Sequence, residues 1–176
     1  MTEIYRVRIQ KERLVFSTAH FITYGDDVCE PIHGHNYHVY CEVEGPLNQN
    51  RYVVDFIALR DALQKVVDQL DHRVVLPLRH PTINVVEQSG GEQGEVVATH
   101  GMRRWVFPRQ DCVLLDVENT TAELLAKHIA EETLALLGPA VRAALASVEL
   151  GVDECDGQWG VYRWRADGEV RANGNP

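Results

Sequence analysis

The chain has 176 residues, of which 45% are hydrophobic and 24% are charged, so it is long enough for one domain with a real core and too short for two. Its formal net charge of -9 excludes the broad cationic surface that nucleic acids or anionic membranes require, which favours chemistry on a small molecule. No segment approaches the roughly 20 apolar residues of a membrane span, and the first residues contain no apolar run of signal-peptide length. We therefore expect a single cytoplasmic domain over residues 1–176, with no nucleic-acid or membrane partner.

The first half of the chain predicts two strands and one helix. Hydropathy alternates along residues 3–22 and again along residues 35–45, which predicts two strands that pair as an antiparallel hairpin with a long connection. Asp55 then precedes a stripe of apolar residues at helical spacing, from Phe56 to Leu70. This pattern predicts a helix of about four turns with Asp55 as its N-cap.

The middle of the chain, about residues 78–111, predicts an insertion. It is irregular, with the turn-rich stretch EQSGGEQGE and three short β-prone pieces, INVVEQ, EVVATH and RRWVFP. We interpret it as an inserted β-hairpin region rather than a second domain. Residues 113–117 then predict a brief strand.

The last part of the chain predicts a second helix and a closing hairpin. Residues 119–138 carry apolar side chains at helical spacing and end in Gly138-Pro139, which predicts a helix. Residues 143–153 and 158–165 are β-prone and predict the hairpin, whereas residues 166–176 predict a frayed end. The order ββ-α-α-ββ predicts an α+β fold, with one four-stranded antiparallel sheet and both helices on one face.

Three histidines near the first hairpin predict a metal site. His33 and His35 are two residues apart at the start of the second strand, so their side chains point to the same face about 7 Å apart. His20 closes the preceding strand and would lie beside His33 in the hairpin. A catalytic zinc site needs three protein ligands and an open position, and imidazole suits zinc. The alternative is that the HxH pair consists of polar residues on a solvated face; His38 points to the opposite face, and we expect it to be a surface histidine.

One of the four cysteines is placed for chemistry. The cysteines are irregularly spaced and form no CxxC, which argues against a disulfide framework or a thiol zinc knuckle. Cys41 and Cys112 lie on apolar strand patterns and are expected to be buried. Cys29 lies in a loop four residues before His33, so we expect it to lie outside the core, where a neighbouring imidazole or cation could activate the thiol.

Asp71 and His72 offer a second pair of titratable groups just after the first predicted helix. A carboxylate can orient a neighbouring histidine for proton transfer if the backbone turns between them. The alternative is a histidine at a helix C-terminus beside a solvated acid.

Six short stretches then carry a resemblance to a known family. They are FSTAH, CEPIHGHNYHV, VVDF, LDH, NTTAE and SVEL. In this order and at these separations they resemble the 6-pyruvoyltetrahydropterin synthase family, which includes the bacterial 6-carboxytetrahydropterin synthases. The resemblance covers about residues 4–165, apart from the insertion. It implies the tunnelling fold (T-fold), in which subunits form homotrimers and two trimers form a hexamer with active sites between subunits.

The resemblance also implies a role for each matching position. By it, the zinc ligands are His20, His33 and His35. The proton-transfer set is Cys29, Asp71 and His72. The carboxylate that anchors the pterin is Glu149, and the segment that lines the pterin pocket contains Thr120, Thr121 and Glu123.

Two of these positions also have simpler interpretations. Glu123 lies three residues after Thr120, which is the spacing of a capping box that closes the first turn of a helix without any ligand. Glu149 lies among apolar strand residues, where a carboxylate is costly unless it is paired, but alternation places it opposite Val148 and Leu150, so it could be solvated.

The sequence departs from the compact members of this family in two ways. The insertion at about residues 78–111 resembles that of longer bacterial and protozoan members, which form 6-hydroxymethyl-7,8-dihydropterin for folate synthesis. Those relatives carry a glutamate in place of the cysteine, whereas this chain has both Cys29 and Glu30. The two residues are candidates for the base that selects the product, although Glu30 could also be a solvated acid before Pro31.

The resemblance implies a zinc-dependent lyase that converts 7,8-dihydroneopterin triphosphate to 6-pyruvoyltetrahydropterin, or to a related 6-substituted pterin, with loss of triphosphate. The alternatives are formation of the hydroxymethyl product and formation of 6-carboxytetrahydropterin for queuosine-type deazapurines. Arg103 and Arg104 are candidates to meet the triphosphate. Two rivals come from other classes: a zinc hydrolase, which would usually carry a motif such as HExxH that is missing here, and a non-catalytic pterin- or metal-binding oligomer.

Overall fold

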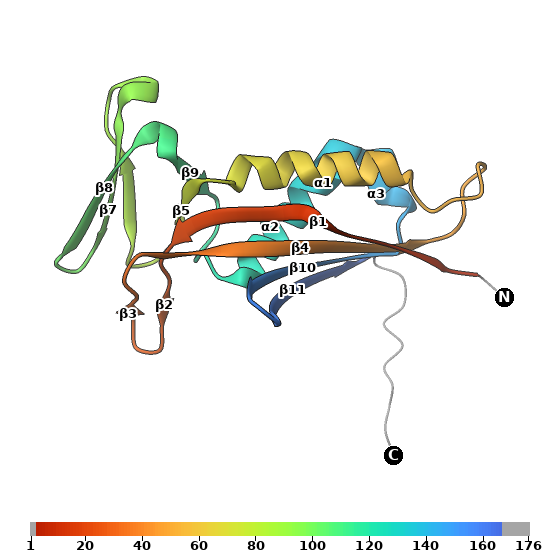
Figure 1. The fold of residues 1–176 in the computed structure, drawn as a ribbon, viewed down its shortest axis with the longest axis horizontal. Coiled ribbons are helices and arrows are strands. Elements are labelled where there is room, and N and C mark those ends of the chain that lie inside the picture. The colour runs from red at the N-terminus through yellow and green to blue at the C-terminus, as the bar shows by residue number, and fades with distance from the viewer. Residues whose placement is uncertain (1–2, 167–176) are drawn as a thin grey trace, which may run out of the picture.

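The fold is built on one long hairpin. The computed structural model describes residues 3–166, and in it β1 (Tyr5–His20) pairs antiparallel with β4 (His33–Gly45), with an irregularity between Gln10 and Val15 (Figure 1). β10 (Ser147–Cys155) pairs antiparallel with β4, and β11 (Gln158–Arg165) pairs antiparallel with β10. These are the four antiparallel strands that the sequence predicts. The predicted frayed end lies outside the described residues, apart from Ala166.

Two further strands make the sheet larger than predicted. β5 (Arg73–Pro77) joins β1 in parallel, and β9 (Cys112–Leu115) joins β5 in parallel. The sheet is therefore mixed and six-stranded, in the order β11-β10-β4-β1-β5-β9. The sequence pattern missed β5 because its five residues, RVVLP, carry no polar–apolar alternation that would mark a half-buried strand.

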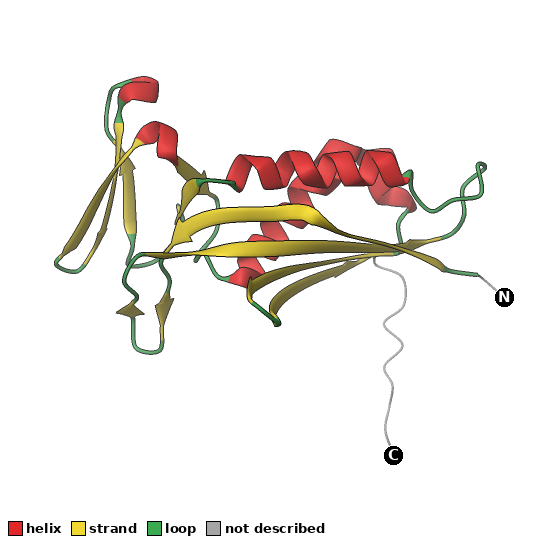
Figure 2. Ribbon diagram, in the orientation of Figure 1, coloured by secondary structure: helices red, strands yellow, loops and turns green. Residues whose placement is uncertain are grey.

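The helices cover one face of this sheet (Figure 2). α1 (Phe56–Leu70) begins at the predicted N-cap, where the Asp55 carboxylate accepts from the backbone N–H groups of Ile57 and Ala58. α2 (Ala122–Leu137) ends at Gly138, whose φ of 87° favours glycine, and the short α3 (Pro139–Ala144) follows. The apolar faces of α1 and α2 bury Leu63, Val67, Leu125 and Ile129 against the sheet, which fixes the strand ends that carry the site described below. No helix in residues 3–166 is long and apolar enough to cross a membrane.

The insertion is a small sheet rather than the predicted hairpin. β6 (Asn84–Glu87), β7 (Glu95–His100) and β8 (Arg103–Pro108) form three antiparallel strands. Two single 3-10 turns, η1 (Gly91–Gln93) and η2 (Arg109–Asp111), flank them. Figure 1 shows this sheet at one end of the molecule, near the short hairpin of β2 (Thr23–Tyr24) and β3 (Val28–Cys29).

A second, smaller hydrophobic core joins the inserted sheet to the main sheet. Its buried members are Phe21, Cys29, Leu76, Ile83, Val96, Ala98 and Cys112. These residues come from the insertion, from β5 and β9, and from the segment after β1. The insertion is therefore packed on the segment that links β1 to β4.

Candidate active site

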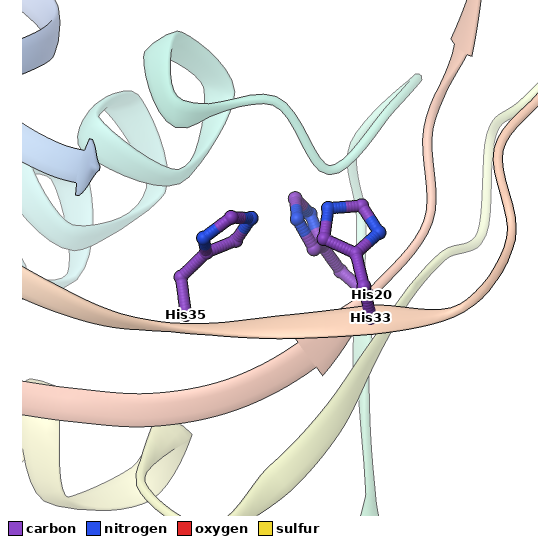
Figure 3. Close-up of side chains that lie close together, drawn as sticks. All are labelled: His20, His33 and His35. Atoms are coloured by element: carbon purple, nitrogen blue, oxygen red, sulfur yellow. The ribbon is translucent and has the colours of Figure 1, made fainter.

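Three histidines converge where the long hairpin ends. His20 is the last residue of β1 and pairs in register with His33, the first residue of β4. His35 lies two residues along β4, so all three side chains leave the same face of the sheet. Each offers one ligand atom, and these atoms lie within 4.8 Å of one another (Figure 3). Among residues 3–166 this is the group with the spacing of a metal site.

Each ring is held by its Nδ1 atom. His20 Nδ1 lies 2.9 Å from the Thr120 carbonyl oxygen, and His33 Nδ1 lies 2.9 Å from that of Pro31. Because a carbonyl only accepts, Nδ1 donates in both rings and the neutral tautomer leaves Nε2 unprotonated. His35 Nδ1 lies 3.5 Å from the Cys155 sulfur, and its Nε2 lies 3.7 Å from Glu154 Oε1.

This donor set fits zinc. Metal-bound histidines usually donate their second N–H to a carbonyl or carboxylate, which fixes the ring for the ion. Burial lowers the pKa of His20, although the Thr120 carbonyl opposes the effect, and so favours the neutral imidazole that binds metal. His33 and His35 are more exposed than His20, so one side of the group stays open for a substrate.

Glu154 and Tyr37 complete the group, and sequence reasoning missed both. Glu154 Oε1 lies 3.2 Å from His20 Nε2 and 3.7 Å from His35 Nε2. The Tyr37 hydroxyl lies 2.9 Å from His20 Nε2 and donates to Glu154 at 3.2 Å. Burial, and then the charge of Glu154, raise the pKa of Tyr37, so its hydroxyl stays a donor.

The sequence contained a signal for Glu154. Val148, Leu150 and Val152 are buried members of the main core, and the next position in that alternation is 154. A carboxylate at the end of an otherwise apolar series lies on the core face, where it needs a partner.

Glu149, by contrast, lies on the opposite face of the sheet from the histidines. Its carboxylate accepts from the Tyr40 hydroxyl at 2.9 Å and pairs with the Arg163 guanidinium. Arg163 and Tyr40 lower the pKa of Glu149. Glu149 is neither solvated nor beside the histidines. Its carboxylate is paired with side chains of the two neighbouring strands, Tyr40 on β4 and Arg163 on β11, rather than with a ligand held at the metal group.

The two candidate bases lie differently from what the sequence predicts. Cys29 is not an open loop residue: it is 7% exposed and belongs to the second hydrophobic core, because the inserted sheet covers it. Burial raises the pKa of its thiol despite the nearby Arg103 cation. Glu30 faces the histidines instead, with Oε2 3.9 Å from His33 Nε2.

Asp71 and His72 form a pair that is not part of the group of three histidines. His72 Nδ1 lies 2.9 Å from Asp71 Oδ2, and Asp71 Oδ1 accepts from the Ser17 backbone N–H. Ser17 and Asn36 face each other in register one position along from Thr18 and His35, so their side chains leave the other face. A hollow there is lined by Ser17, Asn36 and His72, among others.

The remaining predicted residues have structural contacts. Thr120 is buried, where its hydroxyl donates to the Phe21 carbonyl and its own carbonyl holds His20. Thr121, not Thr120, is the N-cap of α2, so the predicted capping box with Glu123 does not form; Glu123 is exposed in the first turn.

Arg103 donates to backbone carbonyls of Cys29 and Glu30, whereas Arg104 is exposed. His38 is exposed and Cys41 and Cys112 are buried, as predicted.

Comparisons with known proteins agree with this fold. A family model described as 6-pyruvoyl tetrahydropterin synthase matches residues 8–165. A Methanocaldococcus jannaschii protein, named by inference as a 6-carboxy-5,6,7,8-tetrahydropterin synthase, is 29% identical over 151 residues, which cover 85% of this chain and 90% of that protein. A Pyrococcus horikoshii protein with the same inferred name is 33% identical over 118 residues, or 66% of this chain and 67% of that protein.

Solved structures share the fold. The crystal structure of 6-pyruvoyl tetrahydropterin synthase from Plasmodium vivax has a TM-score of 0.83 at 25% identity, and covers 93% of this chain and 99% of that one. The Plasmodium falciparum structure has a TM-score of 0.84 at 23% identity, and covers 94% of this chain and 100% of that one.

Proposed function

The chain belongs to the 6-pyruvoyl tetrahydropterin synthase family, and on this premise we propose that it is a zinc-dependent lyase acting on the side chain of 7,8-dihydroneopterin triphosphate. The observation that carries the proposal is the group of three histidines whose ligand atoms lie within 4.8 Å of one another, with the Glu30 carboxylate beside His33, the most exposed of the three. When bound there, zinc supplies Lewis acidity to substrate oxygen atoms.

The protein side chains divide the remaining work. Glu154 lies beside the histidines with its side chain 30% exposed, and we assign to it the binding of the N–H edge of the pterin ring, the role that the family resemblance implied for Glu149. A carboxylate suits that edge because charge-assisted hydrogen bonds from two N–H groups are stronger than neutral ones. Thr121 and Glu123, at the start of α2, remain candidates to line the ring pocket.

Glu30 is the base that the geometry favours. Its carboxylate is close to the ring of a proposed metal ligand, whereas the Cys29 thiol is buried and its pKa is raised. A carboxylate that takes the proton of the second side-chain hydroxyl promotes cleavage of the carbon–carbon bond between the two hydroxyl-bearing carbons. The electron pair of the broken bond stays on the ring-side carbon, which takes up a proton to give 6-hydroxymethyl-7,8-dihydropterin, and the triphosphate leaves on the two-carbon aldehyde.

A second candidate product follows from the curated relatives. Their inferred names point to a 6-carboxytetrahydropterin. The resemblance to the compact family members points to a 6-pyruvoyltetrahydropterin, and for both products it implies the thiol at the position of Cys29 as base. In that route the thiolate would remove the proton beside the ring before triphosphate is lost. Burial of Cys29 opposes this route in the present structure.

The Asp71–His72 pair would join either reaction from a neighbouring subunit of a homotrimer or hexamer. Within one chain the pair lies across the sheet from Glu30, and family members have active sites between subunits, as the resemblance implies. His72 is exposed and oriented by Asp71, so it is available to exchange a proton with a substrate held by another chain.

The test is to incubate zinc-loaded protein with 7,8-dihydroneopterin triphosphate and to identify the pterin product by mass spectrometry. We expect the parent to give the hydroxymethyl product, Glu30→Gln to lose it, and Cys29→Ser to retain it. Loss of every product in Cys29→Ser with no change in Glu30→Gln would show that the thiol alone is the base. Absence of any turnover, with pterin and zinc still bound, would identify a non-catalytic binding protein.

A further inference from the structure

The loop that carries both candidate bases is tied to the inserted sheet at several points. The Arg103 guanidinium, at the start of β8, donates from one nitrogen to the Cys29 carbonyl at 2.8 Å and to the Glu30 carbonyl at 2.9 Å. The Glu30 N–H in turn donates to the Ile22 carbonyl at 3.0 Å. Arg103 of the insertion therefore holds the peptide groups on both sides of Glu30, and Ile22 holds the first of them as well.

Three further contacts hold the β2–β3 hairpin to the insertion. The Thr82 hydroxyl donates to Asp27 at 2.6 Å, and His100 Nε2 lies 3.2 Å from the same carboxylate oxygen. On the other side of the hairpin, Thr23 Oγ1 lies 2.7 Å from His80 Nε2. These contacts hold other parts of the β2–β3 hairpin, whereas Arg103 binds the backbone of the two candidate bases themselves.

Packing decides which side chain the loop turns inward. Cys29 lies in the second core together with the stacked rings of Phe21 and Trp105, whose centroids are 4.3 Å apart. Successive side chains of an extended segment point to opposite sides, so burying Cys29 against the insertion turns Glu30 toward His33. The insertion thus acts on the orientation of both residues at once.

We propose that Arg103 is a positioning residue through which the inserted sheet selects Glu30, rather than Cys29, as the base. The side chain of Arg103 binds the Cys29 and Glu30 carbonyls and so fixes the orientation in which Glu30 faces the histidines, while the Cys29 thiol stays buried in the second core. A chain without this support would leave the loop free to present the thiol to the histidines. The effect of Arg103 on product choice rests on the proposed function, whereas its effect on the accessibility of Cys29 does not depend on that function.

The first test measures the accessibility of Cys29 in the folded, zinc-loaded protein. Iodoacetamide labelling resolved by peptide mass spectrometry gives the rate at Cys29 relative to the exposed Cys155, which serves as an internal reference. We expect Arg103→Ala to raise this relative rate at least about tenfold, because loss of the contact opens the loop. Arg104→Ala, the neighbouring exposed arginine, should leave it unchanged, and Arg103→Lys should restore part of the protection because an ammonium can still donate to a carbonyl.

The second test measures product distribution for the same variants. Arg103→Ala should lower the share of the hydroxymethyl product and raise that of the thiol-dependent product, with zinc content unchanged. If Arg103→Ala does not fold, Thr82→Val can replace it, because it removes the hydrogen bond from the Thr82 hydroxyl to Asp27, farther from the two candidate bases. It should change the Cys29 labelling rate and the product distribution in the same direction, but by less. A folded Arg103→Ala protein with parental labelling and parental products would overturn the inference. If the parent forms no pterin product, the proposed function fails, while the labelling experiment still decides whether Arg103 holds the loop.

Discussion

A backbone carbonyl sets the tautomer of two of the histidines in the site, His20 and His33. A carbonyl oxygen at Nδ1 of His20 and of His33 leaves only Nε2 to face a metal, so the backbone, rather than the metal, sets the tautomer. Thr120 carries one of these carbonyls because it is itself buried and bound to Phe21. The ligand group is therefore organised before any ion binds, which favours binding because little order is lost on association.

Removing one of these ligands should release the ion. We expect the protein to hold about one zinc per chain, and His33→Ala to lose most of it, because structural and catalytic zinc sites need at least three protein ligands. Elemental analysis after dialysis measures the content. His38→Ala is the matched control, since His38 is on the same strand but exposed on the other face. Zinc retained in His33→Ala would contradict the assignment.

Glu154 should act on the substrate rather than on the metal. Glu154→Gln keeps the shape of the side chain but removes the charge, so we expect substrate binding to weaken by about 2 kcal/mol while zinc stays in place. The measurement is KM together with zinc content. The same change at Glu149, on the other face of the sheet, should leave KM unaltered. A larger KM effect at Glu149 than at Glu154 would reverse the two roles.

At the scale of elements, sequence patterns predicted the helix and strands whose formation depends on neighbouring residues. Asp55 and the apolar stripe after it predicted both ends of α1, because the N-cap and the buried face of a helix are formed by residues close together in the sequence. The burial of Cys29 could not be predicted in this way, because the residues that cover it come from the insertion about 50 to 80 positions later. Glu154 was within reach of the alternation along β10, whereas the pairing of Glu149 depended on which residue of β11 lies opposite.

The Glu149–Arg163 pair makes a prediction about stability. Arg163 lies opposite Glu149 in register and, with Tyr40, lowers the pKa of Glu149 below its usual range near 4.3. A depressed carboxyl pKa stabilises the folded state above the unfolded-state pKa, and that contribution is lost as the pH falls through the folded-state pKa. We expect Glu149→Gln to lower the free energy of unfolding by about 1 kcal/mol at pH 7, and the difference from the parent to shrink at about pH 3.

Urea denaturation of both proteins at the two pH values measures this difference. Glu95→Gln, at an exposed acid on β7, is the control and should change stability little at either pH. A Glu149→Gln deficit that stays constant between the two pH values would mean that packing, rather than the charge, supports the pair.

At the scale of the whole molecule, one chain does not bring together all of the proton-transfer groups that the sequence implied. Glu30 lies beside His33, whereas His72, which pairs with Asp71, lines a hollow with Ser17 and Asn36, whose side chains leave the other face of the β1–β4 hairpin. The sequence located each residue but could not place them relative to one another, because the face to which each belongs depends on strand register. If both groups serve one reaction, two chains must contribute to each site.

Mixing two inactive variants tests this arrangement. Glu30→Gln lacks the base and His72→Ala lacks the relay, so each homo-oligomer should be nearly inactive. In a mixed oligomer, a site that takes Glu30 from a His72→Ala chain and His72 from a Glu30→Gln chain is intact, which random assembly of equal amounts gives in about one quarter of sites. Turnover of the co-expressed pair should therefore rise to about that fraction of the parent. If both groups came from the same chain, every site would lack one of them, and the mixture would remain as inactive as the two variants alone.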